Sequence, residues 1–319
     1  MEKETEKILI IKAGYTEVLD GETDSQKVSF GDIIRTTPLL HLYKKDHVTW
    51  ATDEVAVPLL EGNPLISRLM KLDTWALQQL EAEYFDSVIN LEKIPGICAL
   101  TRKIDAWRKF GFRFDPRTGN VKAHDRATEV LGVSFNPEIK RENKKLFQEL
   151  LFEMVGAKWN KEKYILGYQP RTQIEYDVCL NTQVGQKWPT KAWPSKRWDE
   201  LEQMLVGSGY SVSRQDKMMA KMGKNLNSYM DWINSGRVIV SNDSLGLHLG
   251  LALDKKVIGL FGATPHREVY FYENGEALLP EPAPSCLPCF SGVCKREKNC
   301  IEEISSERVY KVIGGYLSR

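Results

Sequence analysis

The sequence lacks both a marked excess of charge and a long apolar run. Its 319 residues include 44 Lys and Arg against 43 Asp and Glu, which leaves a net charge of +1. A net charge this close to zero produces only a weak overall electrostatic field, which argues against nucleic acid as a partner and against general attraction to a membrane surface. No apolar stretch approaches the roughly 20 residues that span a bilayer, and the charged residues 2–7 leave no signal-peptide core. We therefore expect a soluble, cytoplasmic protein with at most peripheral membrane contact.

Two further absences narrow the class of protein. Short repeats and low-complexity tracts are absent from the sequence, which argues against a repeat protein. The first apolar segment, residues 8–11, is followed by Ala13-Gly14-Tyr15 and not by the G-x-G-x-x-G fingerprint of dinucleotide-binding proteins. A dinucleotide-dependent oxidoreductase is therefore disfavoured.

Apolar strand segments and helical segments alternate along the whole chain. Residues 7–11, 48–52 and 85–91 are typical of buried strands, and the helical segments between them predict a parallel sheet. The pattern begins again after the polar residues 158–163, so we expect two doubly wound, Rossmann-like α/β domains that face each other. The predicted parts are residues 1–157, residues 158–304 and a closing helix over residues 305–319.

A βαβ unit in the second half of the chain carries the strongest sign of a ligand site. Residues 238–242 and 256–260 predict buried strands, and the residues between them predict a helix that begins at Asp243 or Ser244. The N-terminus of such a helix presents unpaired backbone N–H groups and the positive end of the helix dipole, and both favour phosphate. Ser244 and His248 would lie one helical turn apart on the same face.

A long polar loop follows the first predicted strand. Residues 14–28 are polar and mixed in charge, and the next helix is predicted to begin at Gly31 or Asp32. Ligands of open α/β sheets bind at the carboxyl ends of the strands, where such a loop lies. Loops of this length without structure of their own are usually functional or disordered. We therefore expect this loop to border a ligand site.

The region between residues 102 and 126 is positively biased. Two interpretations stay open, a solvated helix face with its loop or a site for an anionic ligand. The cationic residues of this region are Arg102, Lys103, Arg108, Lys109, Arg113, Arg117 and Lys122.

Four of the six cysteines lie in one short segment near the C-terminus, at positions Cys286, Cys289, Cys294 and Cys300. In a reducing compartment such crowding favours metal binding or free thiols over disulfides. The four thiols could hold a structural zinc ion or an iron–sulfur cluster. Paired disulfides and free thiols remain open as alternatives, because the spacing alone selects none of the three.

Three separated segments resemble, in the same order, motifs of glycosyltransferase family 9, the ADP-heptose:lipopolysaccharide heptosyltransferases. Residues 29–39, Ser-Phe-Gly-Asp-Ile-Ile-Arg-Thr-Thr-Pro-Leu, resemble the family's S-x-G-D element after the first strand. Residues 191–194, Lys-Ala-Trp-Pro, resemble its K-x-W-P segment. Residues 243–264 are similar to its D-(S/T)-G-x-x-H element with the following strand and G-x-T turn. The resemblance extends over nearly the whole chain.

The resemblance implies a GT-B fold, with the acceptor on the first domain, the nucleotide sugar on the second, and an inverting transfer in the cleft without a required metal. It implies that Asp32 is the base that accepts the acceptor proton, with an N-cap role as the alternative. Lys191 would bind the donor diphosphate, and Lys187, in a partial copy of the motif, competes for that role. The other implied donor-binding residues are Asp243, Ser244, Leu245, Gly246, His248 and Thr264. The candidate acceptor-binding residues are Arg35, Arg102, Lys103 and Arg108.

The implied partners are a nucleoside-diphosphate sugar, ADP-heptose first, and a glycan or lipid-linked acceptor at the inner face of the cytoplasmic membrane. Two departures from the family pattern keep alternatives open. Leu245 stands where the family has glycine, so a Cβ would occupy a point of close approach to phosphate. The loop of residues 14–28 is longer than the family's, so another sugar donor with a non-lipopolysaccharide acceptor, or a non-catalytic sugar-nucleotide-binding protein, remains an alternative. Asp243 could be structural or face the ribose, and His248 could be a core residue.

Overall fold

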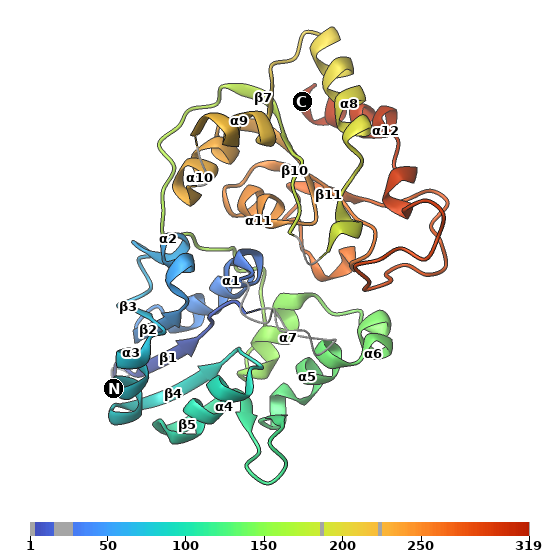
Figure 1. Ribbon diagram of the computed structural model, residues 1–319. Coiled ribbons are helices and arrows are strands. Elements are labelled where there is room, and N and C mark those ends of the chain that lie inside the picture. The colour runs from blue at the N-terminus through green and yellow to red at the C-terminus, as the bar shows by residue number, and fades with distance from the viewer. Residues whose placement is uncertain (1–3, 16–27, 186–187, 223–224, 319) are drawn as a thin grey trace. The chain divides into compact units, whose positions relative to one another are not determined.

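The chain divides into two compact units, Met1–Tyr168 and Gln169–Arg319, each built on its own β-sheet (Figure 1). The computed structural model describes residues 4–15, 28–185, 188–222 and 225–318. The prediction of two Rossmann-like α/β domains is confirmed by these two sheets, whose strands alternate with helices along the chain.

The sheet of the first unit has the strand order β3-β2-β1-β4-β5-β6, parallel except for the antiparallel pair of β5 and β6. The strands are β1 Lys7–Ile11, β2 His47–Thr52, β3 Arg68–Lys71, β4 Tyr84–Asn90, β5 Asp105–Phe114 and β6 Val121–Ala123. The helices are α1 Phe30–Thr36, α2 Val57–Leu60, α3 Thr74–Ala82, α4 Pro95–Lys103, α5 Thr128–Phe135, α6 Pro137–Glu142 and α7 Phe147–Met154.

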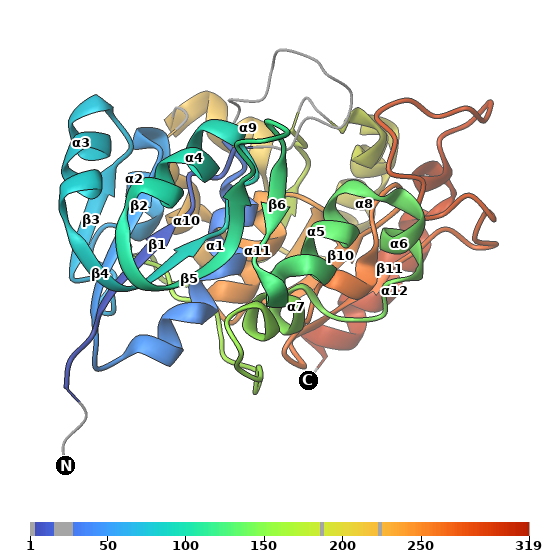
Figure 2. The same ribbon diagram turned by 90° about the horizontal axis from the view of Figure 1, so that it is seen from below.

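Strand β1 lies at the centre of this sheet because its residues are apolar on both faces. Ile8 and Ile10 alternate with Leu9 and Ile11, and all four side chains are fully buried. Helices α3 and α4 cover one face through Leu80 and other apolar residues (Figure 2). The chain leaves β1 toward β2 on one side and reaches β4 on the other side. This reversal of strand order places the expected ligand crevice at the carboxyl ends of β1 and β4.

Strand β5 changes its pairing partner at Gly111. Its parallel pairing with β4 ends where Asn90 opposes Gly111, and its antiparallel pairing with β6 begins at Phe112. Gly111 has a φ of +85°, and a Cβ at this position would lie 1.9 Å from the carbonyl oxygen of Asn90. Only glycine fits here. Because β5 leaves β4 at this residue and pairs with β6 beyond it, the β5–β6 hairpin extends past the level at which β4 ends.

The sheet of the second unit is parallel throughout its described strands, in the order β11-β10-β9-β7-β8. The strands are β7 Tyr176–Asn181, β8 Val212–Arg214, β9 Gly236–Asn242, β10 Lys256–Leu260 and β11 Gly275–Leu278. The helices are α8 Ser195–Gly207, α9 Gln215–Met222, α10 Leu226–Asn234, α11 Leu245–Ala252 and α12 Ser306–Leu317. The order reverses between β7 and β9, so the carboxyl ends of these two strands form the expected crevice.

Helices α8 and α12 pack together over one face of this sheet (Figure 1). Trp198 and Leu201 of α8 meet Ile313 of α12 in one fully buried cluster. The closing helix is confirmed, and its predicted start is capped by Ser305, whose hydroxyl accepts from the Arg308 N–H at 3.2 Å. Among the helices of the described segments, none is both long and apolar enough to cross a membrane.

Residues 158–168 belong to the first unit, although the polar stretch 158–163 predicts a domain boundary after residue 157. The backbone N–H of Ile165 donates to the Thr37 hydroxyl at 2.9 Å, and that of Gly167 donates to the Leu59 carbonyl at 2.9 Å. These bonds hold a segment without helix or strand against the first unit. The division therefore falls after Tyr168.

Candidate functional site

Three residues implied as donor-binding meet at the carboxyl edge of the second sheet. Asp243 directly follows β9, Thr264 follows β10, and Lys191 ends a short 3₁₀ helix between β7 and α8. One carboxylate oxygen of Asp243 accepts from the Lys191 ammonium at 2.7 Å and from the Thr264 hydroxyl at 2.6 Å. The structure thus brings together residues that lie far apart in the sequence.

The Asp243 carboxylate is charged and largely buried. Its side chain is 14% exposed and that of Lys191 17% exposed. Burial alone would raise the pKa of Asp243, but the Lys191 charge, the nearby His248 and the two hydrogen bonds together hold this pKa well below its ordinary value. Lys191 is therefore not an isolated cation, because its ammonium group stabilises the Asp243 carboxylate.

The loop that carries Lys191 is anchored on both sides of this residue. The backbone N–H of Trp193 donates to the Asn242 side chain at 3.0 Å, and the Trp193 indole donates to the Ile304 carbonyl at 2.9 Å. On the other side, the Thr190 hydroxyl donates to the Ser291 carbonyl at 2.6 Å. Trp193 is 2% exposed, so it is a packing residue that fixes the loop. Lys187 lies outside the described residues.

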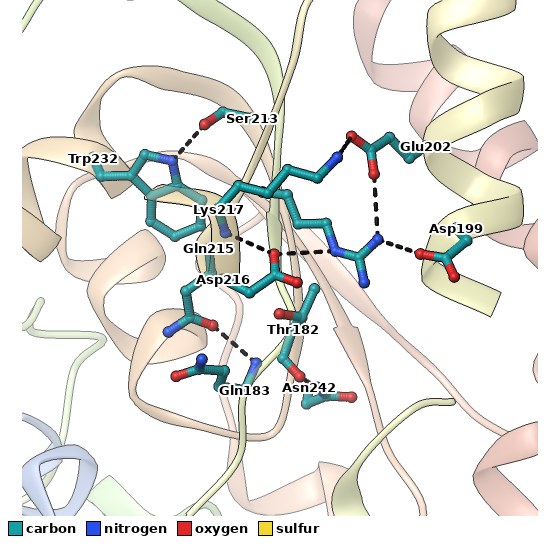
Figure 3. A network of polar contacts seen from close by, with 11 residues as sticks. Thr182, Gln183, Asp199, Glu202, Ser213, Gln215, Asp216, Lys217, Trp232 and Asn242 are labelled. Atoms are coloured by element: carbon teal, nitrogen blue, oxygen red, sulfur yellow. Dashed lines mark hydrogen bonds and ion pairs between the residues drawn. The ribbon is translucent and has the colours of Figure 1, made fainter. Parts of the chain in front are cut away.

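A second polar network, around Arg214 at the end of β8, holds the first residues of the same loop (Figure 3). The buried Arg214 guanidinium pairs with Asp199 at 2.5 Å and Glu202 at 3.2 Å, and thereby ties β8 to helix α8. The next side chain, Gln215, accepts from the backbone N–H of Gln183 at 2.8 Å. The backbone that leads from β7 toward Lys191 therefore has a defined course where it leaves the sheet.

Asn181, at the end of β7, fixes the start of helix α11. Its side-chain amide donates to the hydroxyls of Ser241 at 2.8 Å and Ser244 at 2.9 Å, and its carbonyl accepts from the buried Tyr229 hydroxyl at 2.5 Å. Sequence reasoning missed both Asn181 and Tyr229. A polar residue at the end of an apolar strand signals such a position for Asn181, but Tyr229 is recognisable only from the tertiary structure.

Helix α11 begins at Leu245 with Ser244 as its N-cap, one residue after the later of the two predicted starts, Asp243 and Ser244. Gly246 is therefore the second helical residue. A Cβ on Gly246 would lie 2.4 Å from the Asn181 side chain and 2.6 Å from the Tyr229 hydroxyl, so glycine is required there for internal packing. His248 is 4% exposed inside the first turns of this helix, where it contributes to the low pKa of Asp243.

Asp32 lies in the first turn of α1 in the first unit, with its side chain 43% exposed. The helix begins at Phe30 with Ser29 as the N-cap, so Asp32 is the third helical residue and not the cap that the alternative interpretation required. An Arg35 guanidinium nitrogen lies 3.8 Å from its carboxylate. Asp32 thus combines a defined backbone position with access to solvent.

The base of the loop before α1 is held by a buried ion pair at the switch point of the sheet. The Lys12 ammonium lies 2.9 Å from the Glu92 carboxylate, which also accepts from the Gly14 backbone N–H at 2.8 Å. The Gly14 carbonyl in turn accepts from the Ser29 N–H at 2.6 Å. This chain of contacts fixes both ends of the long loop and the entry into α1. Residues 16–27 of the loop lie outside the described residues.

The four candidate acceptor-binding cations have different surroundings. Arg35 stacks over the Phe147 ring at 3.9 Å from its centroid. Lys103 pairs with Glu81 at 3.1 Å, and Arg108 pairs with Glu6 at 2.6 Å. Arg102 is exposed at the end of α4. The structure therefore leaves Arg102 better placed for an external anion than Lys103 or Arg108, whose charges are already matched.

The four clustered cysteines are free thiols, from the exposed Cys286 to the buried Cys300. Burial raises the pKa of Cys300 to about 11, and the charges of the other three thiols add to this effect. Across the described ranges, no three His, Cys, Asp or Glu side chains stand together at metal-ligand spacing. The donor set itself, four thiols, is nevertheless the one that structural zinc and iron centres use.

Two Rossmann-like units, the second with a polar cradle at a helix N-terminus, define the GT-B class. The model of glycosyltransferase family 9 (heptosyltransferase) matches residues 215–300. This match confirms the resemblance that the sequence motifs indicate. No curated protein sequence matches the chain.

Solved heptosyltransferase structures share the fold over the whole chain. E. coli heptosyltransferase WaaC with ADP-2-deoxy-2-fluoro heptose is 17% identical, with 97% of this chain and 99% of that chain covered and a TM-score of 0.62. E. coli ADP-heptose lps heptosyltransferase II is 14% identical, with 98% of each chain covered and a TM-score of 0.67. The iron-containing dodecameric glycosyltransferase TibC from E. coli is 16% identical, with 99% of this chain and 77% of that chain covered and a TM-score of 0.60. The predicted GT-B fold is confirmed.

The Asp243–Lys191 pair predicts a specific dependence of stability on pH. The pKa of Asp243 is depressed in the folded state, so its stabilisation is present above the unfolded-state pKa of about 3.9 and is lost as the pH falls below it. At pH 7 we expect Asp243→Asn to lower the free energy of unfolding by about 3 kcal/mol, because it leaves Lys191 without its counter-charge. The difference from the wild type should shrink between about pH 4 and pH 2. Urea denaturation at several pH values measures it.

The double variant Lys191→Met/Asp243→Asn is the control for this measurement. It removes both charges and should recover part of the lost stability. Parallel pH profiles of the wild type and Asp243→Asn would contradict the assignment.

Proposed function

We propose that the protein is a family 9 glycosyltransferase that transfers a sugar, heptose from ADP-heptose as the first candidate, onto a glycan acceptor. The observation that carries the proposal is the convergence of Lys191, Asp243 and Thr264 beside the N-terminus of α11. Asp243 and Thr264 lie within the segment that matches the family model. WaaC and TibC, which share the fold, have been solved with an ADP-heptose analogue and with ADP-D-beta-D-heptose.

The donor diphosphate would bind where α11 begins. The backbone N–H groups of Leu245 and Gly246 are at the positive end of the helix, and the Ser244 hydroxyl, held by Asn181, is beside them. Lys191 supplies a full positive charge whose position is set by Asp243. Leu245 would contribute to this arrangement through its backbone N–H, which any residue at this position supplies.

The reaction that we propose is a single displacement. An acceptor hydroxyl oxygen forms a bond to C1 of the sugar, the bond from C1 to the diphosphate oxygen breaks, and the diphosphate leaves with the electron pair. Asp32 takes the hydroxyl proton, and one displacement of this kind inverts the configuration at C1. Lys191 and the helix N-terminus stabilise the charge that develops on the leaving diphosphate. In this scheme transfer requires no divalent cation.

Two alternatives make different predictions. The same scaffold could use another nucleoside-diphosphate sugar with a non-lipopolysaccharide acceptor, since the sequence segment 14–28 before the S-x-G-D element is longer than in the family. A non-catalytic protein that binds sugar nucleotides would keep the Lys191 site but would not depend on Asp32. A binding measurement therefore tests the donor site, and a transfer assay with variants of Asp32 tests catalysis.

The donor site is tested by thermal unfolding in the presence of ADP, UDP and GDP and of ADP-heptose. A ligand that binds only the folded state raises the unfolding midpoint, by about 2.7 kcal/mol of stabilisation at one hundred times its Kd. We expect the largest shift with the adenine nucleotides. Lys191→Ala should weaken ADP binding about tenfold or more, because a charge-assisted hydrogen bond is lost. The exposed Lys196 offers a matched control, since Lys196→Ala removes the same charge from helix α8.

If ADP raises the unfolding midpoint of Lys191→Ala and Lys196→Ala by the same amount, the diphosphate-binding role passes from Lys191 to Lys187. A stronger response to UDP or GDP would select the alternative donor.

Asp32→Asn should abolish transfer while ADP binding stays unchanged. The variant keeps the size of the side chain but removes the proton acceptor, and loss of a general base typically lowers kcat by about 10²–10⁴-fold. The matched control is Glu138→Gln, which makes the same change in the first turn of α6 in the same unit. Turnover is measured with ADP-heptose and a glycan acceptor. Undiminished kcat in Asp32→Asn would remove Asp32 from the mechanism.

We further propose that the four clustered thiols hold a structural metal that supports the donor site. The segment that carries them bonds to the donor-site loops, through Thr190 and Ser291 as described and through the Phe290 N–H, which donates to the Ala263 carbonyl at 2.9 Å. Ala263 precedes Thr264, so the cysteine segment braces the loops of both Lys191 and Thr264. The relative TibC is iron-containing, and a tetrathiolate suits iron or zinc.

Elemental analysis of the purified protein should find about one zinc, or an iron centre, per chain. Cys289→Ser should release the metal and weaken ADP binding as well, because the brace behind Thr264 loosens. Cys98→Ala, which removes a buried thiol from the first unit, should leave the metal content unchanged. Metal-free wild-type protein with full ADP affinity would refute the proposal.

A further inference from the structure

The first unit holds a basic pocket at the outer edge of its sheet. A cavity of about 320 Å³ lies between the end of α4, strand β5 and the hairpin that joins β5 to β6. This volume is at the lower end of the range of about 300–1,000 Å³ that small-molecule sites occupy. The cationic side chains that line it are Arg102, Lys109, Arg113 and Arg117, with His124 beside them.

The positive charge of this pocket is not neutralised by the residues that the structure describes. None of the four cations forms an ion pair with a described carboxylate, whereas Arg108 on the same strand pairs with Glu6 at 2.6 Å. Lys109 donates to the Arg102 carbonyl at 3.0 Å, and Arg113 donates through Nε to the Ala123 carbonyl at 3.2 Å. These bonds to neutral groups fix the side chains and leave further N–H donors available to a ligand.

Asp115, an acidic residue of the lining, serves the hairpin turn. Its carboxylate accepts from the Arg117 backbone N–H at 3.0 Å, and this bond, with help from Thr118 and Lys122, lowers its pKa. The carboxylate is thus committed to the backbone turn that positions Arg117. Its negative charge remains, so the lining combines four cationic side chains with one carboxylate and stays positive overall.

The pKa of His124 is affected by the same excess of positive charge. Burial lowers the pKa of His124, and the charges of Arg113 and Lys109 lower it further. Two cations from β5 therefore act on one imidazole at the start of the segment after β6. A bound anion would relieve the repulsion among these groups.

The hairpin brings the pocket to the same edge of the sheet, the carboxyl ends of β1 and β4, that the connection from β1 to helix α1 with Asp32 follows. Gly111 is level with Asn90, at the carboxyl end of β4, so Phe114 and Pro116 lie beyond that edge. Strand β4 lies between β1 and β5 in the sheet. Two strand spacings correspond to a lateral distance of about 10 Å between β1 and β5. Figure 1 shows the connection of β5 to β6 as a loop that protrudes from the first unit.

We propose that this pocket binds the phosphate group of a phosphorylated sugar. Arginine guanidinium groups match phosphate oxygens in a bidentate manner, and Lys109 adds a point charge. Phe114 and Pro116 offer apolar surface against which a sugar ring can pack. The volume exceeds what a bare phosphate needs. The identification of this sugar as part of the acceptor rests on the proposed function, whereas phosphate binding itself does not.

The test is thermal unfolding of the full chain with glucose 6-phosphate, inorganic phosphate and glucose, at constant ionic strength and with saturating ADP present. Glucose 6-phosphate should raise the unfolding midpoint more than inorganic phosphate does, and glucose should have no effect. The double variant Lys109→Gln/Arg113→Gln should weaken this response at least about tenfold. Constant ionic strength is needed because exposed cations are screened by salt.

Lys122→Gln is the matched control, because Lys122 opposes Arg113 across the hairpin but does not line the pocket. It should keep the response to glucose 6-phosphate. The midpoints without ligand show whether each variant folds. A response that survives in the double variant, or one that is equally weakened in Lys122→Gln, would overturn the proposal. A response to inorganic phosphate alone would overturn the assignment to a sugar phosphate.

The response to ADP in the same series belongs to the second unit. If ADP has no effect on the unfolding midpoint but glucose 6-phosphate raises it in a titration without ADP, the proposed function is contradicted and the pocket is supported. The opposite result, ADP binding without any response to glucose 6-phosphate, would contradict the pocket alone.

Discussion

One largely buried carboxylate, that of Asp243, determines the geometry of the second unit's site. Burial of this charge is unfavourable unless it is matched, and the match comes from Lys191 on one neighbouring loop and Thr264 on the other. Both loops must therefore adopt the observed course for the unit to be stable. The pair is electrically neutral as a whole, so the backbone N–H groups at the start of α11 add to the positive potential that Lys191 presents to an anion.

Much of the fold and part of this site could be predicted from the sequence. Fully apolar runs such as residues 8–11 specify buried parallel strands, and the carboxyl ends of adjacent parallel strands lie at one edge, which is why Asp243 and Thr264 could be expected near each other. The partner of Asp243 could not be predicted. Lys191 reaches it only because Trp193 is anchored to Asn242 and Ile304, contacts that no local pattern encodes.

The basic region shows the same limit in the first unit. Composition marks residues 102–126 as positively biased, but the state of each charge depends on residues far away in the sequence. Arg108 is neutralised by Glu6 across 102 positions, whereas Lys109, its immediate neighbour, lines the pocket. Adjacent residues of a strand point to opposite faces of the sheet. A shift of one position along β5 therefore separates Arg108, which pairs with Glu6, from Lys109, which lines the pocket. Similarly, the polar residues 158–163 resemble a linker in the sequence, whereas hydrogen bonds to Thr37 and Leu59 hold the residues that follow them against the first unit.

The chain between β11 and the 3₁₀ helix at Cys300–Glu303 contains no helix or strand in the structure. It nevertheless bonds to Thr190, which precedes Lys191, and to Ala263, which precedes Thr264. The loops of Lys191 and Thr264 are thus held by a segment that has no regular secondary structure of its own. A cross-link or shared metal among its thiols would restrict the conformations of this segment, so the order of both loops would depend on the chemical state of the cysteines.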